Sequence, residues 1–207
     1  MSKENGVIYR ISGPVVTAVG ISPRMYEVVR VGNEGLMGEV IELHGDQSVI
    51  QVYEETSGVR PGEPVVRTGQ TLSVQLGPGL LTKIYDGIQR PLPELEKTMG
   101  VFIKRGVDAD GLDLEKIWSF NATAKAGDSV SSGDILGTVQ ETKTIEHKVM
   151  VPPGVSGKIK SIDSGEFNVT QTVCTLEEGA EIQMMQKWPV RTPRPFTKKH
   201  APEVPLQ

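Results

Sequence analysis

The stretch Ser48-Val49-Ile50-Gln51-Val52-Tyr53 decides the fold class of this 207-residue chain. Its apolar and polar side chains follow the two-residue period of a β-strand that buries one face. The same period recurs over residues 7–11, 26–31 and 39–43, and glycine-containing turn signals stand between these segments. Short strands at such spacing predict a small closed barrel or sandwich over residues 1–76.

Glycine and proline support this prediction. The chain has 23 Gly and 14 Pro but only 5% aromatic residues, a composition that favours short strands joined by tight turns. One turn has a defined geometry. In Arg60-Pro61-Gly62, proline presets the first central dihedral and glycine accepts the positive second one, so we expect a type II turn there.

Residues 77–110 have a different pattern. Gly77-Pro78-Gly79 interrupts the last strand, and Pro93 followed by Glu94 is typical of the first turn of a helix. Proline has no amide hydrogen to lose there, and an acidic side chain interacts well with the positive end of the helix dipole. We therefore predict a connector with one short helix.

Strand patterns return in residues 111–187, which predict a second β domain. The expected strands cover residues 117–123, 135–139, 145–151, 155–162, 167–169, 173–176 and 181–187. After Trp188 the chain is rich in proline, so residues 188–207 are predicted to be extended and to lie along a neighbouring surface. The last residues carry no closing element, and we expect the chain to be part of a longer one.

Charge and cysteine content exclude several classes of function. The net charge of −4 and the pI near 5.5 argue against a nucleic-acid binder, which needs a basic face. A single cysteine allows no intramolecular disulfide, and we expect Cys174 to be a small core residue. No targeting or membrane-spanning segment is visible, which predicts a cytoplasmic chain that meets a membrane only through a partner.

One segment, Gly154-Val155-Ser156-Gly157-Lys158, has the glycines and the lysine of a phosphate-binding loop. Such a loop needs a glycine where Pro152 stands and a magnesium-binding hydroxyl where Ile159 stands, and a helix must follow it. The residues after Lys158 alternate as a strand does. We therefore expect a turn between strands rather than a nucleotide site.

Another candidate site centres on Lys143. The glycine and aspartate pattern of residues 127–136, together with residues 152–159, resembles a lipoyl or biotinyl carrier domain, which bears its cofactor on a lysine at an exposed hairpin tip. The resemblance has two departures: Thr142 replaces the expected Asp or Met, and the run from Lys143 to Gly157 is long. Residues 144–151 also read as a strand. The barrel-sandwich fold is expected here, and modification of Lys143 is the weaker alternative.

No other residues form a constellation that carries chemistry. The histidines are scattered, and no Ser or Cys stands near a base. The acidic residues are interpreted as solvated strand ends, and the basic tail as a linker on an acidic neighbour. We predict no catalytic, cofactor-binding or metal-binding residues; the residues weighed are His44, His147, His200, Glu54, Glu55, Glu141, Glu177, Glu178, Arg191, Arg194, Lys198 and Lys199.

Long contiguous strings give the chain a specific resemblance. It is similar to the front part of the catalytic A subunit of archaeal-type and vacuolar-type rotary ATPases, and residues 111–187 resemble the "bulge" domain inserted in that family. Residues 188–195 resemble the exit toward its nucleotide-binding domain. The strings lie at residues 6–16, 25–27, 38–41, 50–58, 68–69, 73–81 and 85–92.

The resemblance implies a function as well as a fold. Residues 1–76 would form a six-stranded closed barrel that holds an alternating A/B hexamer together by contacting B subunits. The bulge would dock stator or regulatory subunits of a complex that couples ATP synthesis or hydrolysis to proton or sodium transport. The phosphate loop and catalytic glutamate of the family match no position here. ATP and Mg²⁺ are therefore expected only in the full-length protein, and this chain alone is predicted to be inactive.

Overall fold

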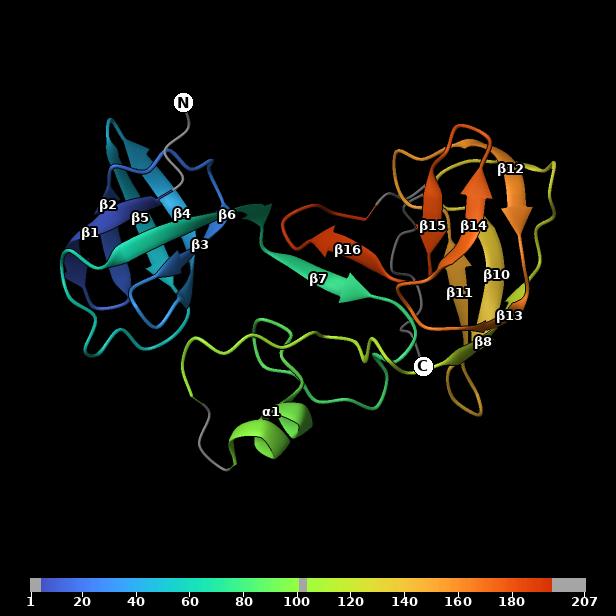
Figure 1. The fold of residues 1–207 in the computed structure, drawn as a ribbon, viewed down its shortest axis with the longest axis horizontal. Helices are drawn as coiled ribbons and strands as arrows, with labels where there is room; N and C mark the ends of the chain where they lie inside the picture. Colours follow the sequence, from blue (N-terminus) through green and yellow to red (C-terminus); the bar gives the residue numbers. More distant parts are fainter. Residues whose placement is uncertain (1–4, 101–103, 195–207) are drawn as a thin grey trace, which may run out of the picture.

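A computed structural model describes residues 5–100 and 104–194 of the chain. Figure 1 shows a β-barrel at one end, a two-sheet sandwich at the other, and a two-stranded ribbon between them. Beneath the ribbon in this view lies a connector that carries the helix α1. The predicted order of barrel, helical connector and second β domain is confirmed.

Six antiparallel strands close the barrel in the order β1-β2-β5-β4-β3-β6, which confirms the six-stranded closed barrel. A closed barrel leaves no free strand edge, so it is stiff and meets its neighbours through side chains. The strands are β1 (Asn5–Ser12), β2 (Val15–Val19), β3 (Glu27–Val31), β4 (Leu36–His44), β5 (Gln47–Val52) and β6 (Pro64–Thr71).

The two-residue period on which the fold class was predicted is visible in the burial of β5. Ser48, Ile50 and Val52 point into the barrel, while Val49 and Gln51 are only partly buried. The inward residues join a core built mainly from valine, isoleucine and leucine. Burying each such side chain contributes about 1.5–3 kcal/mol to stability.

The turn at residues 60–63 has the predicted geometry. Gly62 has a φ of +89°, and the Glu63 amide donates to the Arg60 carbonyl at 3.3 Å. A positive φ at the third residue of the turn is the mark of type II, which glycine accepts without strain.

The barrel ends at Thr71, before the predicted boundary at residue 76. The next residues form β7 (Ser73–Leu76), which pairs with β16 (Gln186–Pro189) in a separate two-stranded ribbon. The strand predicted over 181–187 is accordingly divided between β15 (Glu181–Gln183) and β16. A two-residue period does not reveal a change of partner strand, so the sequence pattern missed both features.

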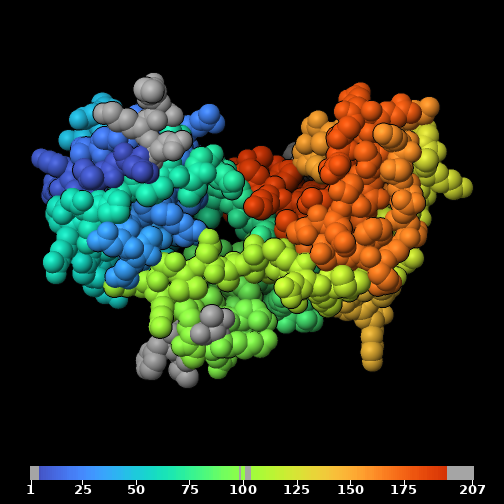
Figure 2. All heavy atoms as spheres, viewed as in Figure 1, coloured from blue at the N-terminus to red at the C-terminus, as the bar shows by residue number. Residues whose placement is uncertain are grey.

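The helix α1 (Leu92–Met99) confirms the predicted start of the connector helix. Proline stands in its first turn with Glu94 beside it, and Gly100 caps its other end with a φ of +76°. Leu95 is its most buried side chain. Figure 2 shows the surrounding residues of the connector as the lower part of the junction between the two lobes.

The second β domain is a sandwich of two four-stranded sheets, ordered β11-β10-β8-β13 and β15-β14-β12-β9. Two clusters fill it, one around Phe120 and Trp118 and one around Ile159 and Leu176. Its remaining strands are β8 (Trp118–Ala122), β9 (Ser129–Val130), β10 (Ile135–Gln140), β11 (Glu146–Met150), β12 (Gly157–Ile162), β13 (Gly165–Phe167) and β14 (Thr172–Leu176).

Candidate functional site

The segment that resembles a phosphate loop forms a turn that leads into a strand, as predicted. The Gly154 amide donates to Ser132 Oγ at 2.9 Å, and the Val155 amide donates to the Pro152 carbonyl at 3.2 Å. β12 begins at Gly157, so no helix terminus faces this turn. Amides that already have partners and a strand in place of a helix cannot cradle a phosphate.

Lys143 lies in the exposed connection between β10 and β11, which pair as an antiparallel hairpin. Thr144 and Ile145 were predicted as strand but belong to this connection. The reason is that Thr142 Oγ1 accepts hydrogen bonds from both of their amides, at 3.4 and 3.1 Å. Such side-chain bonds compete with the strand ladder. The lysine therefore does stand at a hairpin tip.

Two of the acidic residues interpreted as solvated are in fact buried. The side chain of Glu54 is 8% exposed, and its Oε2 accepts the Gly106 amide at 2.8 Å. The side chain of Glu141 is 5% exposed, and its Oε1 accepts the amides of Gly79 and Leu81 at 2.8 and 3.0 Å. Because these hydrogen bonds come from backbone amides, no sequence pattern pointed to them. Both carboxylates tie the connector to a β domain.

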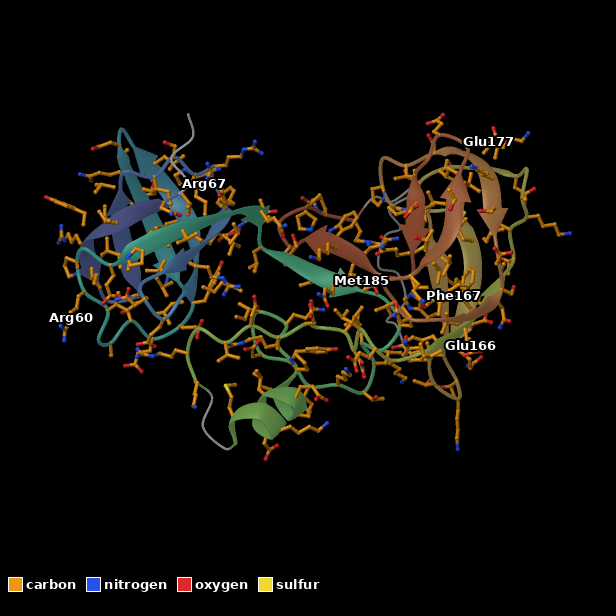
Figure 3. The ribbon with its side chains drawn as sticks, in the orientation of Figure 1. Arg60, Arg67, Glu166, Phe167, Glu177 and Met185 are labelled. Carbon is orange, nitrogen blue, oxygen red and sulfur yellow. The ribbon has the colours of Figure 1, made fainter. Side chains whose placement is uncertain are left out.

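The other acids follow the prediction. Glu55, Glu177 and Glu178 are exposed, and Glu177 lies at the outer end of the sandwich (Figure 3). Among the basic residues, Arg191 meets an acidic neighbour, Glu39, as predicted. Lys198, Lys199 and His200 lie outside the described residues.

The described histidines, His44 and His147, and the cysteine, Cys174, do not come together in one site. His44 contacts Glu42 on the same strand, and His147 Nδ1 lies 3.6 Å from Glu141 Oε2. Cys174 is 1% exposed, and burial raises the pKa of its thiol, as expected for a core residue. Within residues 5–100 and 104–194, no group of three or more His, Cys, Asp or Glu side chains is placed to hold a metal ion.

Two buried carboxylates organise the barrel wall nearest the ribbon. Glu27 accepts a bidentate pair of hydrogen bonds from Arg67, at 2.8 and 2.9 Å (Arg67 is labelled in Figure 3). Glu39 accepts another bidentate pair from Arg191, which lies 152 residues further along the chain. Bidentate arginine–carboxylate pairs fix geometry as well as charge. Both carboxylates stand in the strings that carry the family resemblance, but sequence reasoning did not weigh either as a candidate site residue.

The connector is attached to the barrel by further ion pairs. Arg105 pairs with Glu34 at 2.9 Å and donates to the carbonyls of Glu55 and Ser57. Beside it, a Cβ on Gly106 would stand 2.0 Å from the Glu34 carbonyl oxygen, so only glycine allows this approach. The connector therefore packs on the barrel as a fixed element.

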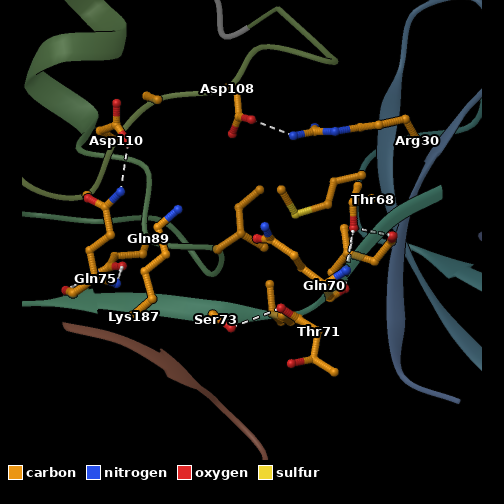
Figure 4. A pocket seen from close by; sticks show the side chains of 16 residues that line it. Arg30, Thr68, Gln70, Thr71, Ser73, Gln75, Gln89, Asp108, Asp110 and Lys187 are labelled. Carbon is orange, nitrogen blue, oxygen red and sulfur yellow. Dashed lines mark hydrogen bonds and ion pairs between the residues drawn. The ribbon is translucent and has the colours of Figure 1, made fainter. Parts of the chain in front are cut away.

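A cleft of about 340 Å³ opens where barrel, ribbon and connector meet (Figure 4). Arg30 from the barrel pairs with Asp108 of the connector at its edge, and Gln75 of β7 donates to Asp110 at 2.7 Å. Lys187 of β16 points into the cleft. Most of these polar groups bind one another. Their bonds hold the barrel, the ribbon and the connector together around the cleft.

The barrel also exposes apolar side chains along β1 and β6. We call Val7, Tyr9, Pro64 and Val66 the apolar strip. Val7 lies opposite Pro64 in the ladder, and Val7, Tyr9 and Val66 are 45%, 61% and 39% exposed. Adjacent exposed apolar residues on a stiff wall are typical of a protein–protein contact. Among the described residues, no helix has the length and hydropathy that a membrane span requires.

Comparisons with known proteins agree with this architecture. Residues 8–69 match the beta-barrel domain of the ATP synthase alpha/beta family, and residues 109–191 match the ATP synthase alpha/beta subunit barrel-sandwich domain. Among curated proteins, the A subunit of the A-type ATP synthase from Methanosarcina barkeri is 62% identical over 97% of this chain. Those from Methanoculleus marisnigri and Natronomonas pharaonis are 62% and 58% identical over 99% and 98% of it.

The chain spans 35% of the length of each of these relatives. Both matched domains coincide with the barrel and the sandwich of the structure, and they occur in the same order. The chain therefore belongs to the ATP synthase alpha/beta family, of which it carries the beta-barrel domain and the barrel-sandwich domain.

Proposed function

We propose that this chain is the N-terminal, non-catalytic portion of the A subunit of an archaeal or vacuolar-type rotary ATPase. The full-length subunit would synthesise or hydrolyse ATP within a complex that transports protons or sodium ions. The proposal is supported by the identity of about 60% to the A subunits of A-type ATP synthases along nearly the whole chain. The complex would be cytoplasmic and peripheral to a membrane that it meets through other subunits.

In this proposal the barrel holds the A/B hexamer together through contacts with B subunits. The observation that carries it is the apolar strip on β1 and β6, which stands on a barrel with no free strand edge. Such a barrel wall keeps its shape while neighbouring subunits press against it. The hexamer would thus stay closed at one end while the rest of each subunit moves.

Titration of this chain with the matching B subunit, followed by native mass spectrometry, tests the contact. We expect a complex that Tyr9→Glu combined with Val66→Asp weakens by about tenfold or more, because both place charge in an apolar contact. Leu43→Asp is the matched control. Leu43 is 44% exposed on β4, which is three strands from β1 in the barrel order. Equal weakening by the control, or no complex, would overturn the proposal.

The sandwich would dock stator or regulatory subunits. This role is supported by the position of the sandwich as a separate lobe at the end of the ribbon (Figure 2). Cross-linking of the assembled complex through the exposed Lys143 and Lys158 tests this role. Links to stator subunits are expected, and links only to A and B subunits would contradict it.

ATP and Mg²⁺ would bind elsewhere in the full-length subunit. The purified chain with Mg-ATP is expected to release no phosphate above background, and Lys158→Ala is expected to change nothing. Turnover that Lys158→Ala abolishes would make the 154–158 turn a nucleotide site after all.

A free-standing carrier or adaptor that uses Lys143 is the alternative function. The exposed position of this lysine at the β10–β11 tip favours it. Against it, Glu141 at the foot of the same tip is bonded to Gly79 and Leu81, so the hairpin is tied down on one side. The intact mass of the endogenous protein separates the two. A lipoyl or biotinyl increment on Lys143 supports the carrier, and an unmodified lysine removes it.

A further inference from the structure

Residues 189–194, which we call the strap, run back from the ribbon onto the barrel. The Val190 amide donates to the Leu72 carbonyl at 2.9 Å. Trp188 Nε1 donates to the Thr192 carbonyl at 2.7 Å, and the Arg194 guanidinium lies 4.4 Å from the centre of the Trp188 ring. Few backbone bonds hold the strap, so side chains decide whether it stays on the barrel.

The main side-chain contact is the one between Arg191 and Glu39. Arg191 donates to both Glu39 oxygens, at 2.9 and 2.5 Å, and its guanidinium lies 4.5 Å from the centre of the Tyr26 ring. The Glu39 side chain is 2% exposed, whereas the Arg191 side chain is 54% exposed. Water and salt therefore reach the cation while the carboxylate stays buried.

Glu39 also has a donor that belongs to the barrel. Tyr53 Oη donates to Glu39 Oε2 at 2.9 Å, from the end of β5. A cavity of about 220 Å³ adjoins the carboxylate, lined by both the barrel and the strap. If the strap lifts, Glu39 keeps the tyrosine bond and gains water from this side. An unpaired buried charge is costly, but these partners offset part of that cost.

Glu27 provides the contrast within the same wall. Its donors are Arg67, the Arg24 amide and the Gly69 amide, all of them inside the barrel sequence. Breaking the Glu27 pair must therefore disturb the barrel itself. Breaking the Glu39 pair disturbs only the attachment of a segment that follows β16 of the ribbon.

We propose that Glu39 and Arg191 form a latch that holds the strap on the barrel and can open without unfolding of the barrel. The closed latch gives the barrel a further connection to the sandwich, beside the connector and the β7–β16 ribbon, and so fixes the angle between the two lobes. The open latch leaves the connector and the ribbon to join the two lobes. The latch concerns this chain alone and does not depend on the proposed function.

Hydrogen exchange of the full chain tests the latch, with the Val190 amide as the reporter of the strap. Glu39→Gln keeps the size of the side chain but removes its charge. We expect it to speed exchange at Val190 by about tenfold or more, because charge-assisted hydrogen bonds are lost. Amides in the barrel core, such as those of Val16 and Val29, are expected to keep their protection.

Arg191→Met is the second variant. The Arg191 side chain is 54% exposed and Tyr53 remains as a donor to Glu39, so the barrel is expected to lose some stability but to keep its fold. Like Glu39→Gln, Arg191→Met is expected to speed exchange at the Val190 amide while the amides of the barrel core keep their protection. Raising salt from about 0.05 M to about 1 M is expected to speed Val190 exchange in the natural chain and not in Arg191→Met, since only the ion pair is screened.

Glu27→Gln is the matched control. It removes an equally buried charge of the barrel, so it is expected to speed exchange in β3 and β6 before that of the strap. The latch proposal is wrong if the Val190 amide stays protected from hydrogen exchange in both Glu39→Gln and Arg191→Met. It is equally wrong if the strap loses protection only together with the barrel strands.

Discussion

Arg67 binds Glu27 through two nitrogens, Nε to Oε1 at 2.8 Å and Nη2 to Oε2 at 2.9 Å, and thereby links β6 to β3 on the barrel wall. The Glu27 side chain is 2% exposed and that of Arg67 is 15% exposed. Removing one partner of a buried ion pair is strongly destabilising. The pair is therefore a structural requirement of the barrel.

Glu27→Ala is expected to lower the free energy of unfolding of the barrel by about 3 kcal/mol, the lower end for buried pairs, because Arg67 keeps some access to water. Urea unfolding with circular dichroism measures this. Glu94→Ala is the control, since the Glu94–Lys97 pair on α1 is exposed and is expected to contribute less than about 1 kcal/mol. Equal effects of the two variants would contradict the assignment.

Acid is expected to destabilise the barrel through its paired carboxylates. Burial alone would raise the pKa of Glu27, but hydrogen bonds from Arg67 and the amides of Arg24 and Gly69 together hold that pKa below its usual 4.5. Hydrogen bonds from Arg191 likewise lower the pKa of Glu39, against the effect of burial. The folded state then binds fewer protons than the unfolded state.

The direction in which stability changes with pH follows from this difference in bound protons. The stability that these carboxylates contribute is complete above pH 4.5 and is lost as the pH falls through their lowered pKa values in the folded state. Urea unfolding is measured at a series of pH values. The urea concentration at the midpoint is expected to fall once the pH is below 4.5. A chain carrying both Glu27→Gln and Glu39→Gln should show a flatter curve, and an equally steep one would count against the explanation.

His147 is expected to titrate below the usual histidine pKa of 6.5, because burial lowers its pKa and the nearby Glu141 carboxylate offsets only part of that shift. Folding then favours the neutral ring, so this contribution to stability is present above pH 6.5 and is lost as the pH falls. Proton NMR of the imidazole measures the midpoint. Glu141→Gln should lower it further, since the attraction to the charged ring disappears; a rise would refute the contact.

Gly106→Ala is expected to weaken the attachment of the connector to the barrel. The new Cβ would stand 2.0 Å from the Glu34 carbonyl oxygen, and the φ of +70° also disfavours alanine. Gly100→Ala has nearly the same φ, +76°, but no atom within 4 Å of its Cβ, so it introduces backbone strain of about 1–3 kcal/mol without a clash. Urea unfolding should show a clearly larger loss for Gly106→Ala, and equal losses would mean that the clash is relieved.

Much of the fold could be predicted from the sequence, because its causes are local. The alternation around Ile50, the turn at Pro61-Gly62 and the helix start at Pro93 each depend on residues within a few positions of one another. The family resemblance rested on equally local strings. The same reasoning correctly interpreted the 154–158 turn as the entrance to a strand.

The predictions failed where a distant partner decides the structure. Glu54 and Glu141 were interpreted as solvated, but the amides of Gly106, Gly79 and Leu81 bury them. An amide has the same chemistry in every residue, so its sequence context does not mark it as a partner. The strand expected over residues 181–187 divides between two sheets for the same reason.

The sequence by itself determined the barrel, the connector helix, the sandwich and the family, since strand period, turn chemistry and helix signals act over short distances. Only the tertiary structure decided that β7 pairs with β16, and that Arg191 closes on Glu39 across 152 residues. Burial of a charge needs a partner in space, and that partner exists only once the chain has folded.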